Sequence, residues 1–67
     1  MKVKDYDFKY NDIEMITSSL DGTRLGKMAL LPIGAFKRDF GYMEVLSVKN
    51  YEDTKTTSVI VHSEGLD

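Results

Sequence analysis

Hydrophobic positions in this chain recur mainly at every second residue, which is the spacing of half-buried β-strands. The clearest cases are residues 56–62, which are rich in β-branched side chains, and residues 42–49. The polar stretch 50–55 between them predicts a hairpin loop. Residues 2–10 also alternate, with charged residues on one side, and predict a further strand. The aromatic residues on the other side of that strand are Tyr6, Phe8 and Tyr10.

The apolar residues of segment 13–20 fit both a helix and a strand. Asp21-Gly22 follows this segment, and Asp-Gly between two apolar segments is a strong hairpin signal. We therefore favour a strand over 13–20 and a return strand over 23–33. A helix over 12–20 is the alternative for the first of these segments.

The densest apolar run, residues 26–36, contains the only proline of the chain, Pro32. A short helix over 27–31, ended by this proline, is the rival of the return strand because these five residues are good helix formers. In a sheet, proline belongs at an edge, at an end or in a bulge. We expect a bend over 32–34, followed by a loop over 36–41.

Two of the predicted strands carry apolar residues on both faces, which a flat sheet with one wet face does not need. A curled sheet, a small barrel, or a sheet covered by a helix or a second subunit does need them. We predict one domain over 1–67 of the mainly β class, a curled antiparallel sheet or five-stranded barrel with one short helix at most. The alternative is α+β, with one helix on a three- or four-stranded antiparallel sheet.

Composition changes this picture by removing the usual means of stabilising a small domain. A 67-residue domain buries only about 60% of the surface that its unfolded chain exposes. Disulfides are excluded because the chain has no cysteine, and its single histidine argues against a zinc site. Self-association or docking on another protein remains, so we expect a homo-oligomer.

The charge balance and the start of the chain bear on partners and compartment. Nine basic and eleven acidic residues give a net charge of −2, which lowers the expectation of a general DNA binder. The N-terminal residues lack the apolar core of a signal peptide, and no apolar run approaches the roughly 20 residues that span a membrane. We expect a cytoplasmic protein that does not bind membranes.

Catalytic chemistry is not expected. His62 is the only histidine, stands at the end of a predicted strand, and has no motif that pairs it with a nucleophile. Residues 22–26, G-T-R-L-G, are too short for a phosphate-binding loop and lack its Lys-Ser/Thr pair. We predict no catalytic residue, no metal and no cofactor.

Aromatic rings and cations alternate in Phe36, Lys37, Arg38, Phe40 and Tyr42, a combination that binds single-stranded nucleic acids by stacking on bases and neutralising phosphates. The sequence R-D-F-G-Y-M over 38–43 resembles the aromatic ribonucleoprotein motif of cold-shock and RNA-recognition domains. Val59-Ile60-Val61-His62 is similar to the second motif of cold-shock domains. This resemblance is local, and the function of those families is not carried over from it. The alternative that these residues indicate is an OB-like protein that binds single strands. The competing interpretation is that Phe36, Phe40 and Tyr42 are core residues.

Tyrosine is also favoured at protein interfaces, because its ring is rigid and apolar and carries a polar tip. We predict a small non-enzymatic binding module that covers a surface of another protein, in the manner of phage or mobile-element inhibitors. The alternative is the single-stranded nucleic-acid binder. The candidate binding residues are Phe36, Lys37, Arg38, Phe40, Tyr42, Tyr6, Tyr10 and Tyr51.

Overall fold

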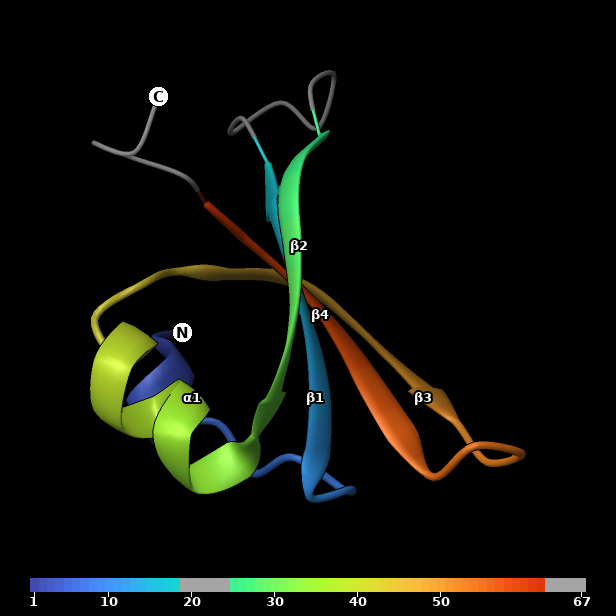
Figure 1. Cartoon of the computed structure of the whole chain (residues 1–67). Coiled ribbons are helices and arrows are strands. Elements are labelled where there is room, and N and C mark those ends of the chain that lie inside the picture. The colour runs from blue at the N-terminus through green and yellow to red at the C-terminus, as the bar shows by residue number, and fades with distance from the viewer. Residues whose placement is uncertain (19–24, 63–67) are drawn as a thin grey trace.

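The computed structural model describes residues 1–18 and 25–62. In this part of the chain, one short α-helix and one turn of 3-10 helix lie on the same side of a four-stranded sheet (Figure 1). The elements, in chain order, are η1 (Val3–Asp5), β1 (Asp12–Ser18), β2 (Leu25–Pro32), α1 (Ile33–Phe40), β3 (Val45–Tyr51) and β4 (Thr56–His62).

The sheet has the strand order β2-β1-β4-β3. The pairs β1–β2 and β3–β4 are antiparallel, whereas the central strands β1 and β4 run parallel. Parallel neighbours need a long crossover connection, and here β2, α1 and β3 together supply it. The mainly β class is confirmed, in a form close to the α+β alternative: the sheet has four strands instead of five, is mixed and is not closed into a barrel.

The strands predicted before and after the Asp-Gly turn are present as β1 and β2, so the alternative helices over 12–20 and 27–31 are wrong. The turn itself, Asp21-Gly22, lies outside the described residues. The two strands pair antiparallel, as a hairpin requires. The register places Ile13 and Met15, both buried, beside Leu31 and Ala29 of β2. These positions form the face of the sheet that α1 covers.

Helix α1 occupies the segment that was predicted as a bend and a loop. Pro32 has an extended backbone (φ −68°, ψ 152°) and ends β2, and the helix begins at the next residue. Ile33, Phe36 and Phe40 then recur at helical spacing and all pack on the core. The bend and loop were predicted in place of this helix because Gly34 and the preceding proline suggested a turn. The spacing of Ile33, Phe36 and Phe40 would have indicated a helix.

The strand predicted over 2–10 is wrong, although its two sides are correctly predicted. After η1, the N-terminal segment crosses the covered face of the sheet without forming a strand. Phe8 is buried and Tyr6 packs on the core, whereas Asp7 between them is exposed. The alternation therefore reflects a segment lying on an apolar surface, and not pairing with a neighbouring strand.

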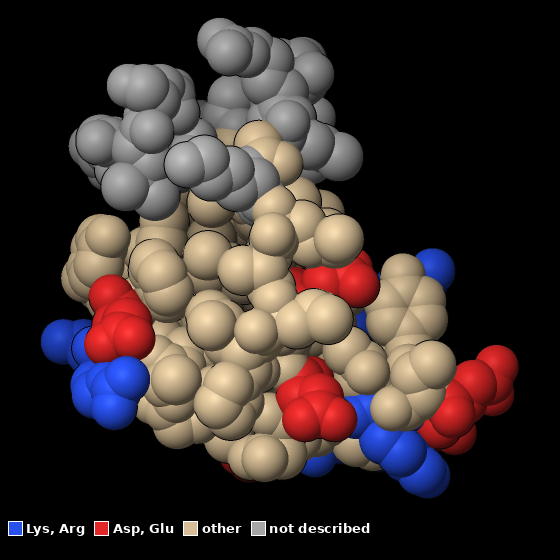
Figure 2. Space-filling view, viewed as in Figure 1, with Lys and Arg blue, Asp and Glu red and all other residues tan. Residues whose placement is uncertain are grey.

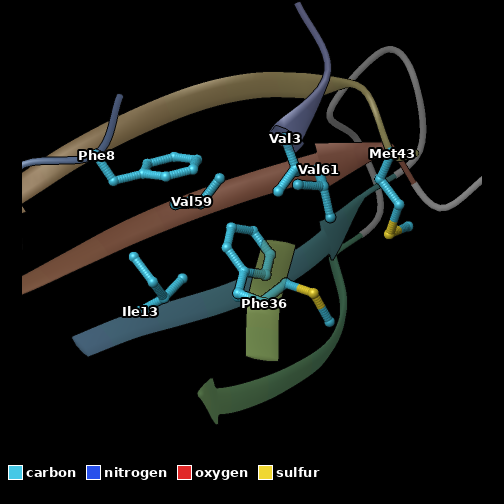
Figure 3. Packing of buried hydrophobic residues seen from close by; sticks show 8 residues of the cluster. Val3, Phe8, Ile13, Phe36, Met43, Val59 and Val61 are labelled. Atoms are coloured by element: carbon cyan, nitrogen blue, oxygen red, sulfur yellow. The ribbon is translucent and has the colours of Figure 1, made fainter. Parts of the chain in front are cut away.

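The core lies between the covered face of the sheet and the layer formed by α1 and the N-terminal segment. Phe36, Ile13 and Val59 are completely buried there. Figure 3 shows the Phe36 ring turned toward Ile13 and the Phe8 ring lying over Val59. The ring centroids of Phe8 and Phe36 are 5.5 Å apart, within the range of favourable aromatic pairs. The buried apolar residues are Val3, Phe8, Ile13, Met15, Phe36, Met43, Val59 and Val61.

A completely buried hydroxyl group, that of Thr57, links three parts of the fold. It donates a hydrogen bond to the Asn50 side-chain oxygen of β3 (2.9 Å). It also accepts one from the backbone N–H of Tyr10 at the end of the N-terminal segment (3.3 Å). Thr57 thus fixes the N-terminal segment to the two strands of the β3–β4 hairpin.

Replacing Thr57 by valine should lower the free energy of unfolding by about 1–3 kcal/mol, because the partly buried Tyr10 N–H loses its acceptor while the side-chain shape is kept. Urea denaturation followed by circular dichroism would measure this. Thr56→Val is the matched control, because the Thr56 hydroxyl donates its hydrogen bond to the Thr54 carbonyl at an exposed site in the adjoining turn. Equal stability of Thr57→Val and wild type would contradict the prediction.

Candidate protein-interaction surface

The face of the sheet turned away from α1 is called here the open face. Residues paired directly across the strands lie on the same face, so the register identifies its members. No described helix lies over this face, as Figure 1 shows. From β2 to β3, the open face consists of Met28, Leu30 and Pro32; Asp12, Glu14 and Ile16; Thr56, Ser58 and Ile60; and Ser47, Lys49 and Tyr51.

An apolar row crosses the open face over its three neighbouring strands β2, β1 and β4. Met28 pairs with Ile16, and Ile16 pairs with Ile60. Leu30 extends the row along β2. Leu30 and Met28 are exposed by 72% and 63%, and both isoleucines are partly exposed. Contiguous exposed apolar side chains of this kind mark interaction sites more often than single exposed residues do.

Charges divide the open face into an acidic and a basic side. Asp12 and Glu14 belong to β1, whereas Lys49 belongs to the edge strand β3. The Ser58 hydroxyl between them donates a hydrogen bond to a Glu14 carboxylate oxygen (3.3 Å). The Lys49 ammonium group lies 5.2 Å from the ring centre of Tyr51, a cation–π distance. A partner with a basic group near β1 would therefore be favoured.

A shallow depression of about 330 Å³ lies at one end of the open face, where β2 ends and β1 and β4 begin. Leu30 and Pro32 form apolar parts of its wall, and Asp12 contributes a carboxylate. The remaining lining residues are Ile13, Leu31 and Thr56. This combination suits an apolar side chain, or the alkyl part of a lysine or arginine whose charged end reaches Asp12.

Three of the predicted binding residues belong to the core layer instead. Phe36 is completely buried, so a partner cannot contact it while the protein is folded. Tyr6 and Phe40 are partly buried and pack on the same core. The Phe36 and Phe40 ring centres are 6.4 Å apart. The competing interpretation, core aromatics, therefore holds for Phe36 and largely for Phe40.

The cations predicted beside these rings already have interactions within the chain. The Arg38 guanidinium group and the Asp39 carboxylate form an exposed ion pair at 3.0 Å. The hydrogen bond from Arg38 lowers the pKa of Asp39 below its ordinary value, and the same bond raises the pKa of Arg38. The Lys37 ammonium group lies 5.7 Å from the ring centre of Phe8. Tyr42, in contrast, is 59% exposed in the segment after α1.

Tyr10 and Tyr51 lie near the β3–β4 turn. The Tyr10 ring centre is 5.2 Å from the Lys9 ammonium group and 5.8 Å from that of Lys55. Lys9 also forms an exposed ion pair with Glu52 at 2.9 Å. The hydrogen bond between them raises the pKa of Lys9 and lowers that of Glu52. The eight predicted residues therefore do not form one site, and only Tyr51 belongs to the open face.

The exposed residues Met28 and Leu30 were not among the predicted binding residues. They lie in the densest apolar run of the sequence, 26–36, but only alternate residues of β2 face the core. The signal that could have found them was the presence of apolar residues on both faces of a strand. An edge strand with one covered face does not need leucine and methionine on the other.

Two further findings concern the described part of the chain. Among residues 1–18 and 25–62, no three His, Asp or Glu side chains come together closely enough to hold a metal ion. The helices of this part are all too short or too polar to cross a membrane. No known protein family matches the chain, and no curated protein or solved structure is significantly similar to it.

Proposed function

We propose that this protein is a non-enzymatic, cytoplasmic binding module that acts by covering a surface of another protein, and that the open face is its contact surface. The observation that carries the proposal is the exposed pair Met28 and Leu30, continued by Ile16 and Ile60 across the sheet. Burying a leucine or methionine side chain is worth about 1.5–3 kcal/mol, so this row can provide the centre of an interface. The lack of cysteine fits a reducing compartment.

The chemistry of the open face also favours one kind of partner surface. An apolar centre would lie on Met28 and Leu30, and a lysine or arginine beside it would meet Asp12 and Glu14 on β1. The depression beside Leu30 and Pro32 offers a place for one anchoring side chain. Anchors that fill a pocket near the middle of an interface commonly provide most of the binding free energy.

The nucleic-acid alternative receives less support. In RNA-recognition domains the stacking aromatics lie on the sheet. Here, Arg38 and Phe40 of the similar sequence belong to α1, and Arg38 is paired with Asp39. Val61, in the second similar segment, is completely buried. These positions favour a structural role for most of the residues that carry the resemblance.

The double variant Met28→Ser/Leu30→Ser tests the proposal, because it removes the two most exposed apolar side chains of the open face without adding charge. We expect that proteins retained from lysate by the immobilised wild type are lost by at least about tenfold in this variant, as expected when two buried anchors are removed. Tyr42→Ser is the matched control, because it removes a large side chain of similar exposure (59%) away from the open face. Both variants should unfold at the temperature of the wild type.

Nuclease treatment separates the two functions. Retention that survives nuclease and depends on Met28 and Leu30 supports the protein-binding role. Equal retention by the double variant and wild type would contradict it. Salt-sensitive binding of mixed-sequence single-stranded DNA or RNA in fluorescence anisotropy, lost in Lys37→Ala/Arg38→Ala, would instead support the nucleic-acid alternative.

A further inference from the structure

The outer edge of β2 is available for pairing. Within residues 1–18 and 25–62, β2 pairs with β1 on one side and with no strand on the other. Its sequence, L-G-K-M-A-L-L-P, contains a single charged residue. In Figure 2, which has the view of Figure 1 with β2 toward the viewer, the described surface along this strand is mostly uncharged, with acidic side chains beside it. Exposed apolar edge strands readily accept another strand.

The hydrogen bond between the Ile33 N–H and the Asn11 carbonyl (2.8 Å) indicates which backbone groups face this edge. In an antiparallel pair, residues that bond to the partner strand alternate with residues that do not. Counting from Ile33, Leu31 and Ala29 bond to β1, so the N–H and C=O groups of Met28 and Leu30 point to the free edge. Pro32 belongs to the same outward set, where a missing N–H does no harm.

The opposite edge of the sheet, formed by β3, is protected in three ways. The N-terminal segment covers its beginning, because the Val45 N–H donates to the Met1 carbonyl (2.9 Å) and Lys2 forms a bridge with Glu44. A bulge follows between Val45 and Ser47. Lys49 then places a charge on the strand. Natural proteins use such features to prevent edge pairing, and β2 has only a bulge near its first residues and the proline at its end.

We propose that a second copy of this chain binds at this edge, with the two β2 strands antiparallel about a two-fold axis at Ala29. In this register Met28 of each copy lies opposite Leu30 of the other, so all the outward N–H and C=O groups of both residues are paired. An axis at Met28 would bring the bulged Gly26 opposite Leu30. An axis at Leu30 would bring Pro32, which lacks an N–H, opposite Met28.

Side chains favour the same register. Cross-strand pairing of Met28 with Leu30 places two exposed apolar side chains together, which stabilises antiparallel strands. Residue 27 of one copy lies opposite residue 31 of the other, so the only charged positions in the sequence of β2 do not face each other. Small side chains of Ala29 meet at the axis. The dimer joins the two open faces side by side, and the inference does not rest on the proposed function of that surface.

Sedimentation analysis and amide hydrogen exchange of the full chain test the dimer. From about 10 µM to 1 mM, a range suited to small interfaces, the mass should rise from 7.6 kDa toward twice that value. The exchange rates of the Met28 and Leu30 amides should fall in proportion to the dimeric fraction. The exchange rates of amides on the exposed edge of β3 should not change. Leu30→Pro removes one outward donor and should remain monomeric. Ile60→Thr, on the open face but away from the edge, should still dimerise.

A mass of 7.6 kDa over the whole concentration range would overturn the dimer. Association that leaves the Met28 and Leu30 amides unprotected would show that the copies contact another surface. The exchange experiment uses the wild type, so the dimer is tested even where Leu30→Pro does not fold. If Ile60→Thr still dimerises but no longer retains partner proteins, the dimer forms at the β2 edge independently of partner binding on the open face.

Discussion

Phe36→Ala should come close to unfolding this protein. The Phe36 ring is completely buried between Ile13 and the N-terminal segment, and its removal leaves a cavity that the surrounding layer cannot fill. Truncating a buried phenylalanine costs about 3–5 kcal/mol. A domain of this size has a total stability of roughly 3–10 kcal/mol. Urea denaturation at 25 °C, followed by far-ultraviolet circular dichroism, should show a much lower midpoint than wild type and a free energy of unfolding smaller by about 3–5 kcal/mol.

Two variants control for this effect. Phe36→Leu keeps most of the buried volume and should lose clearly less stability than Phe36→Ala. Tyr42→Ala removes a ring that is 59% exposed and should change the free energy of unfolding by no more than about 0.5 kcal/mol. A Phe36→Ala protein as stable as wild type would show that the ring is not in the core, and would restore Phe36 as a candidate binding residue.

Gly41→Ala should destabilise the protein, whereas Gly34→Ala should stabilise it. A Cβ atom at Gly41 would collide with the carbonyl oxygen of Lys37 and come within 3.1 Å of the Lys4 side chain. The carbonyl belongs to the helix backbone and cannot move away without distorting α1. Overpacking of this kind costs about 1–3 kcal/mol. Gly41 is therefore required where the end of α1 meets η1, and the Lys4 N–H donates to its carbonyl at 3.1 Å.

Gly34 is the matched control because it lies within α1, the helix that Gly41 follows, and has open space around it. Apart from its chain neighbours and the adjacent helix backbone, no heavy atom would lie within 4 Å of an added Cβ atom there. Alanine reduces the freedom of the unfolded chain and suits a helix better than glycine, so we expect a gain of about 0.4–1 kcal/mol. Thermal denaturation of the two variants should give shifts of opposite sign. Shifts of the same sign would contradict this account of the helix end.

Local patterns predicted the strands well, because alternation and β-branched residues act within one segment. The strand predicted over 56–62 agrees with β4 at both ends, and the strand predicted over 42–49 overlaps β3. Pairing partners depend on contacts between distant segments, which one sequence does not contain. The parallel pairing of β1 with β4 and the bulge in β3 were therefore not predictable.

The binding residues were predicted less well, for a related reason. Most of the predicted binding residues were chosen because they are aromatic. In a small domain, however, aromatic side chains are needed to fill the core, as Phe36 and Phe8 do. Exposure of Met28 and Leu30 follows from their position on an edge strand with one covered face, and this position depends on the topology. The alternation within β2 separates these two residues from Ala29 and Leu31, but it does not indicate which pair is exposed.

The parallel pairing at the centre of the sheet also determines when the protein can fold during its synthesis. Asp12 of β1 pairs with Thr56 of β4, so the central pairing of the sheet can form only after β4 has left the ribosome. Until then, the hairpin of β1 and β2 lacks the strand that completes its apolar side, and isolated hairpins are at best marginally stable in water. Closing so long a loop is slow compared with forming local contacts. The apolar edge strand β2 is therefore synthesised before the sheet that supports it can form.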